Sequence, residues 1–191
     1  MKVGLFFGSF NPIHIGHMII ADYMVSFTDL DQVWLVVSPH NPLKAKHSLA
    51  PDYDRLHLVQ LAIDDHPYLR VSDIEFHLPK PSYTVDTLAY LREKYPDKDF
   101  ALIMGGDNLL SLHKWKNYEF LLDNYSIYIY RRPRYEDGPF AQHPNVRIFE
   151  APLLDISASF VRKCRKTGKS IRYLLPDPVY QYLETSHLYR K

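Results

Sequence analysis

The first 28 residues constrain the fold of this chain more than any other stretch. The apolar run over residues 3–7 is short and ends at Gly8, which predicts a strand buried on both faces, as in a parallel sheet. Residues 8–12 (Gly-Ser-Phe-Asn-Pro) have turn composition, and the glycine allows close approach of a ligand. An apolar-periodic segment then predicts a helix that ends near Phe27. Because the first N–H groups of a helix lack internal partners, this strand–turn–helix predicts an anion site.

Two imidazoles, His14 and His17, stand at the start of that predicted helix. Imidazoles at this position can donate hydrogen bonds to phosphate oxygens. A chance surface pair or half of a metal site would have the same spacing, but the H-E-x-x-H pattern is missing and no cysteine cluster accompanies the pair. We interpret the stretch as a nucleotide phosphate cradle.

The rest of the chain alternates between apolar runs and amphipathic segments. We expect further strands over residues 32–39, 69–72, 99–104, 125–130 and 146–149, and helices over residues 51–65 and 178–185 and from residues 82 and 157. The alternation predicts an α/β fold with a doubly wound, mostly parallel sheet and helices on both faces. At 191 residues, we expect a single domain over residues 1–191. On the 51–65 helix, Arg55 and His57 are expected on the surface.

Composition and charge exclude several classes of function. The formal net charge of +1 gives no case for a nucleic-acid partner. The single cysteine, Cys164, excludes an internal disulfide framework and favours a reducing compartment. Without a signal peptide or an apolar run of membrane length, we expect a cytoplasmic protein that has no membrane partner. The Walker A and G-x-G-x-x-G motifs are also missing, which weighs against a P-loop ATPase or a dehydrogenase. The sequence does not indicate an oligomeric state.

Two polar loops follow predicted strands, where open α/β sheets place their ligands. Residues 40–49 contain Lys44 and Lys46. Either lysine could reach a phosphate as a mobile point charge, although a solvated loop has the same composition. Gly105-Gly106-Asp107 follows the 99–104 strand, and its carboxylate could accept hydrogen bonds from ribose hydroxyls. A plain strand–helix turn uses the same residue types.

The helix predicted near residue 82 begins in the string Ser-Tyr-Thr-Val-Asp-Thr-Leu (82–88). Ser82 or Thr84 can cap such a helix, and its free N–H groups would suit a carboxylate. An ordinary capped helix explains the same residues. Trp115, which two lysines flank, is typical either of a lid over the core or of a stacking surface.

The helix predicted from residue 157 has a natural N-cap in Ser157, with Phe160 on its buried face. Ser159 and Arg162 lie close to the same N-terminus and could help to hold an anion there. A well-capped helix without a ligand is the alternative. Either Arg131 or its neighbour Arg132 could also face a substrate, although solvated arginines are the more common case.

The string Gly8-Ser9-Phe10-Asn11-Pro12-x-His14-x-Gly16-His17 resembles the signature of the HxGH nucleotidyltransferase superfamily. The 82–88 string and Trp115 make the chain most similar to the bacterial nicotinate mononucleotide adenylyltransferases, and the matching strings run from residue 8 to residue 162. The resemblance implies a Rossmann-like nucleotidyltransferase fold. It also implies adenylyl transfer from ATP to nicotinate mononucleotide, giving nicotinate adenine dinucleotide and pyrophosphate in NAD biosynthesis.

The resemblance also implies roles for residues of this chain. The catalytic residues would be His14, His17, Lys44 and Arg162. The ATP-binding residues would be Gly8, Ser9, Phe10, Gly105, Asp107, Ser157 and Ser159. Nicotinate mononucleotide would be bound by Tyr83, Thr84 and Trp115, with backbone amides around Thr84 on the carboxylate and the indole on the pyridine ring. The family usually has Pro-His-Lys or Pro-His-Arg where this chain has Pro42-Leu43-Lys44, so Lys46 stays an alternative to Lys44.

The expected chemistry needs no general base, because the attacking 5′-phosphate is already anionic. Positioning and charge stabilisation should then carry catalysis. We expect no protein-built metal site, and Mg²⁺ should arrive mainly on the ATP phosphates. Two alternatives stay open. One is an adenylyltransferase that prefers nicotinamide mononucleotide or another phosphorylated acceptor, and the other is a nucleotide sensor without turnover.

Overall fold

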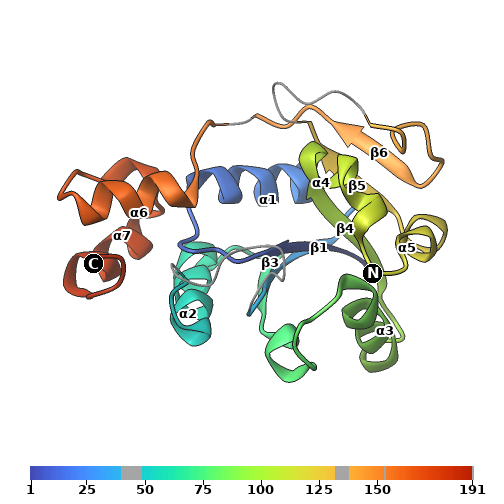
Figure 1. Cartoon of the computed structure of the whole chain (residues 1–191), viewed down its shortest axis with the longest axis horizontal. Helices are drawn as coiled ribbons and strands as arrows, with labels where there is room; N and C mark the ends of the chain where they lie inside the picture. Colours follow the sequence, from blue (N-terminus) through green and yellow to red (C-terminus); the bar gives the residue numbers. More distant parts are fainter. Residues whose placement is uncertain (40–48, 132–137, 153, 191) are drawn as a thin grey trace.

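Six parallel strands form one sheet at the centre of the protein (Figure 1). The computed structural model describes residues 1–39, 49–131, 138–152 and 154–190. The strands are β1 (Lys2–Gly8), β2 (Gln32–Val37), β3 (Leu69–Ser72), β4 (Asp99–Gly105), β5 (Ile127–Tyr130) and β6 (Val146–Phe149). Their order is β3-β2-β1-β4-β5-β6, and all five neighbouring pairs are parallel. This is the doubly wound order of Rossmann folds, so the predicted fold class is confirmed.

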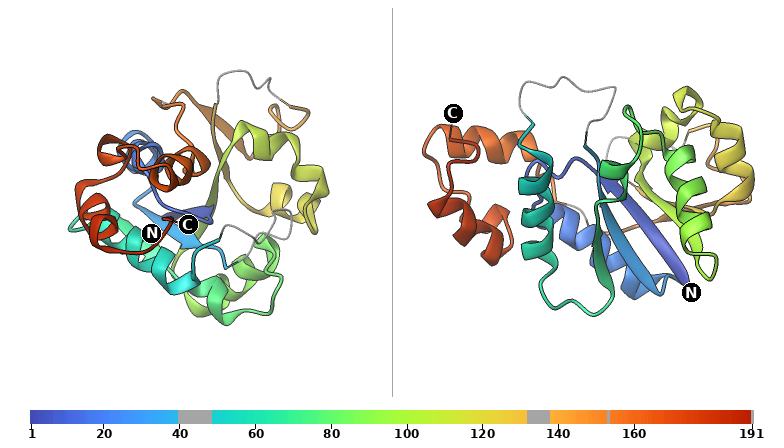
Figure 2. Two further views of the ribbon diagram at one scale, coloured as in Figure 1. Left: turned by 60° about the vertical axis from the view of Figure 1, so that its left-hand side comes forward. Right: turned by 90° about the horizontal axis from the view of Figure 1, so that it is seen from below.

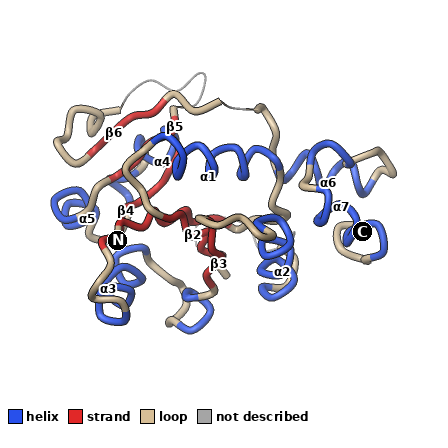
Figure 3. Tube along the Cα trace, turned by 180° about the vertical axis from the view of Figure 1, so that it is seen from behind, coloured by secondary structure: helices blue, strands red, loops and turns tan. Residues whose placement is uncertain are grey.

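Helices cover both faces of the sheet (Figure 3). The α-helices are α1 (Ile15–Phe27), α2 (Asp52–Ile63), α3 (Thr84–Lys94), α4 (Gly106–Leu110), α5 (Tyr118–Asn124), α6 (Ala158–Lys166) and α7 (Asp177–Thr185). Short 3-10 helices η2, η3 and η4 occupy Ile74–His77, Leu112–Lys114 and Arg172–Leu174. α6 and α7 lie at the end of the molecule that holds the carboxyl terminus, away from the amino terminus (Figures 1 and 2).

Alternate side chains of each central strand enter two separate apolar cores. In β2, Leu35 packs with α1, α2, α6 and α7 on one face, whereas Val36 packs with α3, α4 and α5 on the other. β1 divides in the same way between Phe6 and Leu5. A strand that is buried on both faces needs an apolar residue at nearly every position. This requirement is why the central strands could be recognised as continuous apolar runs.

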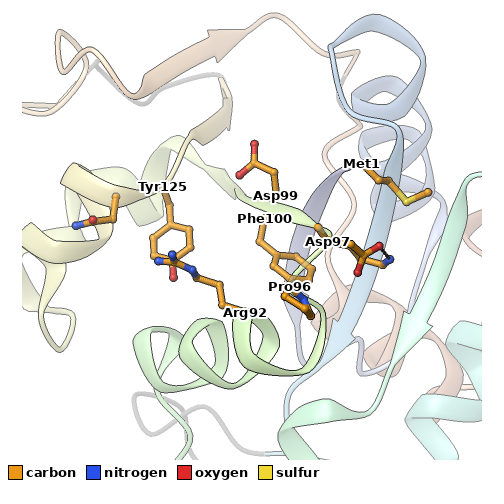
Figure 4. A pocket seen from close by; sticks show the side chains of 9 residues that line it. Met1, Arg92, Pro96, Asp97, Asp99, Phe100 and Tyr125 are labelled. Atoms are coloured by element: carbon orange, nitrogen blue, oxygen red, sulfur yellow. Dashed lines mark hydrogen bonds and ion pairs between the residues drawn. The ribbon is translucent and has the colours of Figure 1, made fainter.

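The strand order reverses between β1 and β4. β1 leads to α1 on one face of the sheet, and β4 leads to α4 on the other face. The two carboxyl ends, Gly8 and Gly105, therefore open into the crevice where doubly wound sheets bind ligands. A pocket of about 570 Å³ opens at the opposite, amino-terminal ends of these strands (Figure 4). That pocket is lined by residues that include Met1, Arg92 and Asp99.

Two details of the helices differ from expectation. α3 has Tyr83 at its N-cap and makes no side-chain capping bond, so neither Ser82 nor Thr84 caps it. Phe160 of α6 is 49% exposed and does not lie on the buried face. That face is formed by Val161 and Cys164. In the described part of the chain, no helix combines the length and apolar character that a membrane span requires.

Candidate active site

The turn after β1 is held in place by the ring of Phe10. This ring is buried and meets Phe6 and His17 edge-on, with centroids 5.8 and 5.1 Å away. A Cβ on Gly8 would lie 2.8 Å from the Phe10 ring, so glycine is required for this packing. Phe10 has a φ of 42°, which is unfavourable for a residue with a Cβ. Burial of the ring offsets that cost and fixes the backbone of the turn.

His14 and His17 are held together at the start of α1. The backbone N–H of His14 donates to Nδ1 of His17 at 3.2 Å. Because Nδ1 accepts this bond, the neutral imidazole of His17 carries its proton on Nε2 and can donate it to a ligand. The two rings stack with centroids 3.7 Å apart. Gly16 permits the stack, since a Cβ there would lie 3.2 Å from the His14 ring.

α6 brings the chain back to the turn of residues 8–12, which is called the phosphate turn after its predicted role. The Ser157 hydroxyl accepts the backbone N–H of Phe160 at 3.1 Å, which confirms the predicted N-cap and leaves the hydroxyl proton available to a ligand. The Arg162 guanidinium donates to the backbone oxygen of Asn11 at 2.7 Å and to Oγ of Ser159 at 3.2 Å. Ser159 and Arg162 therefore lie beside a turn some 150 residues earlier in the sequence, and a shared phosphate site there stays a prediction.

The second strand end supplies Gly105 and Asp107. A Cβ on Gly105 would lie 2.4 Å from Oδ1 of Asp107 and 3.1 Å from the Tyr130 ring. Glycine thus lets the carboxylate fold back over the end of β4. Asp107 is half-buried at the carboxyl edge of the strand beside β1. This placement agrees with the predicted ribose contact, and the contact itself stays a prediction.

Tyr83, Thr84 and Trp115 lie around the start of α3. The Lys116 ammonium lies 2.8 Å from Oδ2 of Asp86 in α3 and 4.9 Å from the centre of the Tyr83 ring. These contacts hold the segment of Trp115 beside the N-terminus of α3. The indole is half-buried and packs against the core on that face of the sheet. Because the first N–H groups of α3 have no intrahelical partners, they can bind a carboxylate there.

Arg55 is buried at the centre of the site, so its expected surface position is wrong. Its side chain is fully buried and donates to the backbone oxygens of Ser9, Ser38, Pro39 and Ala50. It also donates to the carboxylate of Asp52 at 2.7 Å. Arg55 thereby joins the phosphate turn to the end of β2 and to the start of α2. His57 is exposed, as expected.

The spacing along α2 contained a signal for this burial. The buried residues of α2 are Arg55, Leu58, Val59 and Ile63, which recur at helical intervals of three and four. Arg55 therefore continues the apolar stripe by one turn. A charged residue in register with such a stripe is either exposed at its margin or buried with a full set of partners, and here the partners are backbone oxygens.

Glu75 is a second buried residue that the motifs did not indicate. Its side chain is 3% exposed and accepts a hydrogen bond from the Thr87 hydroxyl at 3.0 Å. Burial raises the pKa of this carboxyl, and hydrogen bonds from Ser38, Thr87 and Ser82 act in the opposite direction. In the sequence, Glu75 is a lone carboxylate in a connector, without any pattern around it.

The remaining candidates are divided between the described and undescribed parts of the chain. Lys44, Lys46 and Arg132 lie outside the described residues. Arg131 forms an ion pair with Glu150 at 2.5 Å. Cys164 is buried in the apolar core around α1, α6 and α7, so packing explains it.

Among the described residues, the side chains that could ligate a metal do not form a dedicated cage. Within the ranges that the structure describes, no three His, Cys, Asp or Glu side chains gather into a group that could hold a metal ion. A magnesium ion prefers phosphate oxygens and water and takes only one or two protein ligands at such sites. The polar groups that the structure places at this edge are N–H donors and a guanidinium.

Comparisons with known proteins place the chain in a family. A family model described as cytidylyltransferase-like matches residues 5–164. A protein of Flavobacterium psychrophilum named "Probable nicotinate-nucleotide adenylyltransferase" is 55% identical over 193 residues, with 100% of both chains covered. A protein of the same name from Flavobacterium johnsoniae is 52% identical over 195 residues, again with full coverage of both. This chain belongs to the nicotinate-nucleotide adenylyltransferase family.

Solved structures show the same fold as this chain. The nicotinic acid mononucleotide adenylyltransferase of Plasmodium falciparum, complexed with NaAD, superposes with a TM-score of 0.83 at 20% identity and covers 98% of this chain and 97% of its own. A putative nicotinate-nucleotide adenylyltransferase from Vibrio parahaemolyticus gives 0.74 at 21% identity, with 100% and 96% covered. The resemblance read from the phosphate turn and the 82–88 string is confirmed.

Proposed function

We propose that the residues gathered at the carboxyl ends of β1 and β4 carry out the reaction of the family. That reaction is transfer of the adenylyl group of ATP to nicotinate mononucleotide, which yields nicotinate adenine dinucleotide and pyrophosphate. An oxygen of the acceptor's 5′-phosphate attacks the α-phosphorus, and the bond from that phosphorus to the β-phosphate oxygen breaks. Both attacking and leaving groups are anions, so no proton has to move.

The observation that carries this proposal is the fixed pair of imidazoles. His17 has its Nδ1 occupied by the His14 N–H, and this leaves Nε2–H as a donor at the N-terminus of α1. In our assignment, His14 and His17 donate to oxygens around the α-phosphorus. Arg162 neutralises the departing pyrophosphate from beside Asn11. Such donors act because they are aimed at the developing charge before the reaction starts.

The ATP site continues along the same edge of the sheet. Gly8, Ser9 and Phe10 would present backbone N–H groups, and Ser157 and Ser159 would add hydroxyl donors for the triphosphate. Gly105 would allow the nucleoside to approach, and Asp107 would accept from the ribose hydroxyls. Lys44, or Lys46 in its place, would add a cation to the phosphates. These residue roles stay proposals.

The acceptor site would lie at the start of α3. The amides around Thr84 would bind the nicotinate carboxylate, and Trp115 would stack on the pyridine ring with Tyr83 at its side. The ion pair that joins Lys116 to Asp86 supports this arrangement because it holds the two segments together. A carboxylate gains more than a neutral amide from a helix N-terminus. The acid should therefore be preferred over nicotinamide mononucleotide.

Mg²⁺ would enter with ATP and neutralise charge on its phosphates, with most of its ligands from phosphate and water. We further propose that residues 1–191 act as a single domain, since α6 and α7 share the apolar core of α1 and α2. The lone cysteine favours a reducing compartment, so we expect the protein to be located in the cytoplasm.

Pyrophosphate release tests the function directly. Purified enzyme with ATP and Mg²⁺ is offered nicotinate mononucleotide, nicotinamide mononucleotide or phosphopantetheine in separate reactions. Strong preference for the nicotinate substrate is the expected result. Equal use of both pyridine mononucleotides would rule out the carboxylate pocket at α3 but keep the chemistry. No pyrophosphate release with any of the three would favour a sensor or an enzyme that uses another acceptor.

A further inference from the structure

Glu75 lies between the two halves of the candidate site. It belongs to the short helix Ile74–His77, which comes between β3 and α3. A buried carboxyl is stable only if hydrogen bonds replace its hydration. The partners of Glu75 therefore show which parts of the protein it holds together.

Three hydroxyl groups from different parts of the chain converge on this carboxyl. Thr87, in the first turns of α3, donates at 3.0 Å. The side chains of Ser82, just before α3, and Ser38, just after β2, also hydrogen-bond to Glu75. The carboxyl thus joins both sides of the Tyr83–Thr84 segment to the end of a central strand.

The contacts continue from Ser38 to the phosphate turn. The backbone N–H of Ser38 donates to the backbone oxygen of Gly8 at 2.9 Å, and its backbone oxygen accepts from Arg55 at 2.8 Å. On the other side, the Thr87 hydroxyl also lies 3.2 Å from the backbone oxygen of Tyr83. Hydrogen bonds therefore run from Gly8 through Ser38 and Glu75 to Thr87, whose hydroxyl lies beside the Tyr83 backbone.

We propose that Glu75 is a positioning residue that sets the affinity for the acceptor nucleotide, by fixing the start of α3 relative to the phosphate turn. This inference rests on the proposed function, because it takes the start of α3 as the acceptor site. Glu75 is 3% exposed, so it would act through these partners and not on the substrate itself. Two of its three partners, Ser82 and Thr87, flank the Tyr83–Thr84 segment, so loss of Glu75 should affect the acceptor first.

Glu75→Ala removes all three hydrogen bonds and tests the link. We expect the KM for nicotinate mononucleotide to rise about tenfold, as the loss of a buried hydrogen-bonding group would predict, while the KM for ATP stays close to that of the wild type. Glu75→Gln keeps an acceptor for Thr87 and should restore most of the affinity. Thr87→Val removes one donor and should shift the same KM in the same direction.

A matched control is Glu93→Ala, which removes an exposed carboxylate from the same helix α3. Calorimetric binding of nicotinate mononucleotide is measured beside the kinetics, and thermal unfolding is followed for every variant. If Glu75→Ala does not fold, the acceptor KM of Glu75→Gln and Thr87→Val tests the proposal, because both variants keep the packing of the site.

The outcomes separate the two proposals. A wild-type enzyme that does not use nicotinate mononucleotide overturns the proposed function and this inference with it. A wild type that uses it, with Glu75→Ala and Thr87→Val unchanged in acceptor KM, overturns only the role of Glu75. Equal increases in the KM for ATP and for the acceptor, with a lowered Tm, would show a merely structural residue.

Discussion

At the residue scale, His17 should contribute to rate and little to binding. His17→Ala removes the Nε2–H donor, which acts mainly on charge that develops in the transition state. We expect kcat to fall by about 100-fold to 1000-fold, while the Kd for ATP changes only about twofold or threefold. Single-turnover kinetics and ATP titration measure the two effects. The control is His57→Ala, an exposed imidazole on α2. Equal losses in rate and in ATP affinity would favour a sensor.

Arg55 should matter for stability even when its charge is kept. Arg55→Lys retains the cation but replaces the planar guanidinium, which reaches four backbone oxygens and one carboxylate, with a single ammonium. Some buried acceptors then lose their partner. We expect the free energy of unfolding in urea to fall by about 3 kcal/mol. Arg92→Lys on the exposed side of α3 is the control. A loss as small as that of the control would show that the buried network tolerates an ammonium.

At the element scale, the N-terminus of α6 combines a cap with the predicted triphosphate contact. Ser157→Ala should cost about 1 kcal/mol of stability through the lost cap. Ser157→Asp keeps a capping oxygen, but it places a negative charge where the triphosphate should bind. We expect this variant to retain stability and to raise the KM for ATP about tenfold. An unchanged KM for ATP in Ser157→Asp would place the triphosphate elsewhere.

Elements were predictable where local physics decides them. The central strands are apolar at nearly every position because both faces are covered. Ser157 caps α6 by accepting the backbone N–H of Phe160, the third residue of that helix. The start of α3 was different. Its cap position belongs to Tyr83, because Ser82 is engaged with Glu75 and Thr84 is already the first residue of the helix. Tertiary partners of this kind leave no trace in a local sequence pattern.

At the scale of the whole molecule, the sequence predicted a parallel sheet but not its strand order. Order depends on the face to which each crossover helix packs, and the amphipathic patterns of α1 and α3 do not encode which face that is. The motifs predicted the turn at Gly8 and the histidines, because these residues are used locally. The partners of Arg55 and Glu75 could not be assigned, because they come from elements that meet only in the finished fold.

Asp29 should make the stability of the fold depend on acidity. The carboxylate accepts from the Tyr128 hydroxyl at 2.5 Å and pairs with Lys2 at 2.9 Å and with Arg147 at 3.2 Å, which joins β1, β5 and β6 near their amino-terminal ends. The Tyr128 hydrogen bond, followed by the Lys2 ammonium, holds the pKa of Asp29 well below its ordinary 3.8, against some desolvation. A depressed pKa means that the unfolded chain binds the proton more readily.

The stabilisation by Asp29 is therefore present above about pH 4 and is lost as the pH falls below the unfolded pKa. Asp29→Asn should lower the urea midpoint at pH 7, and its difference from the wild type should shrink toward pH 3. Because Asp29 is half exposed, we expect a modest effect. Catalysis should not change, since the cluster lies at the edge of the sheet opposite the site. The pH dependence contributed by Glu75 runs in the opposite direction from that of Asp29. Because burial raises the pKa of Glu75, this residue favours the folded state at low pH and lowers the stability of the fold as the pH rises. If Asp29→Asn and the wild type differ equally at pH 7 and pH 3, the carboxylate acts through its hydrogen bonds and not through its charge.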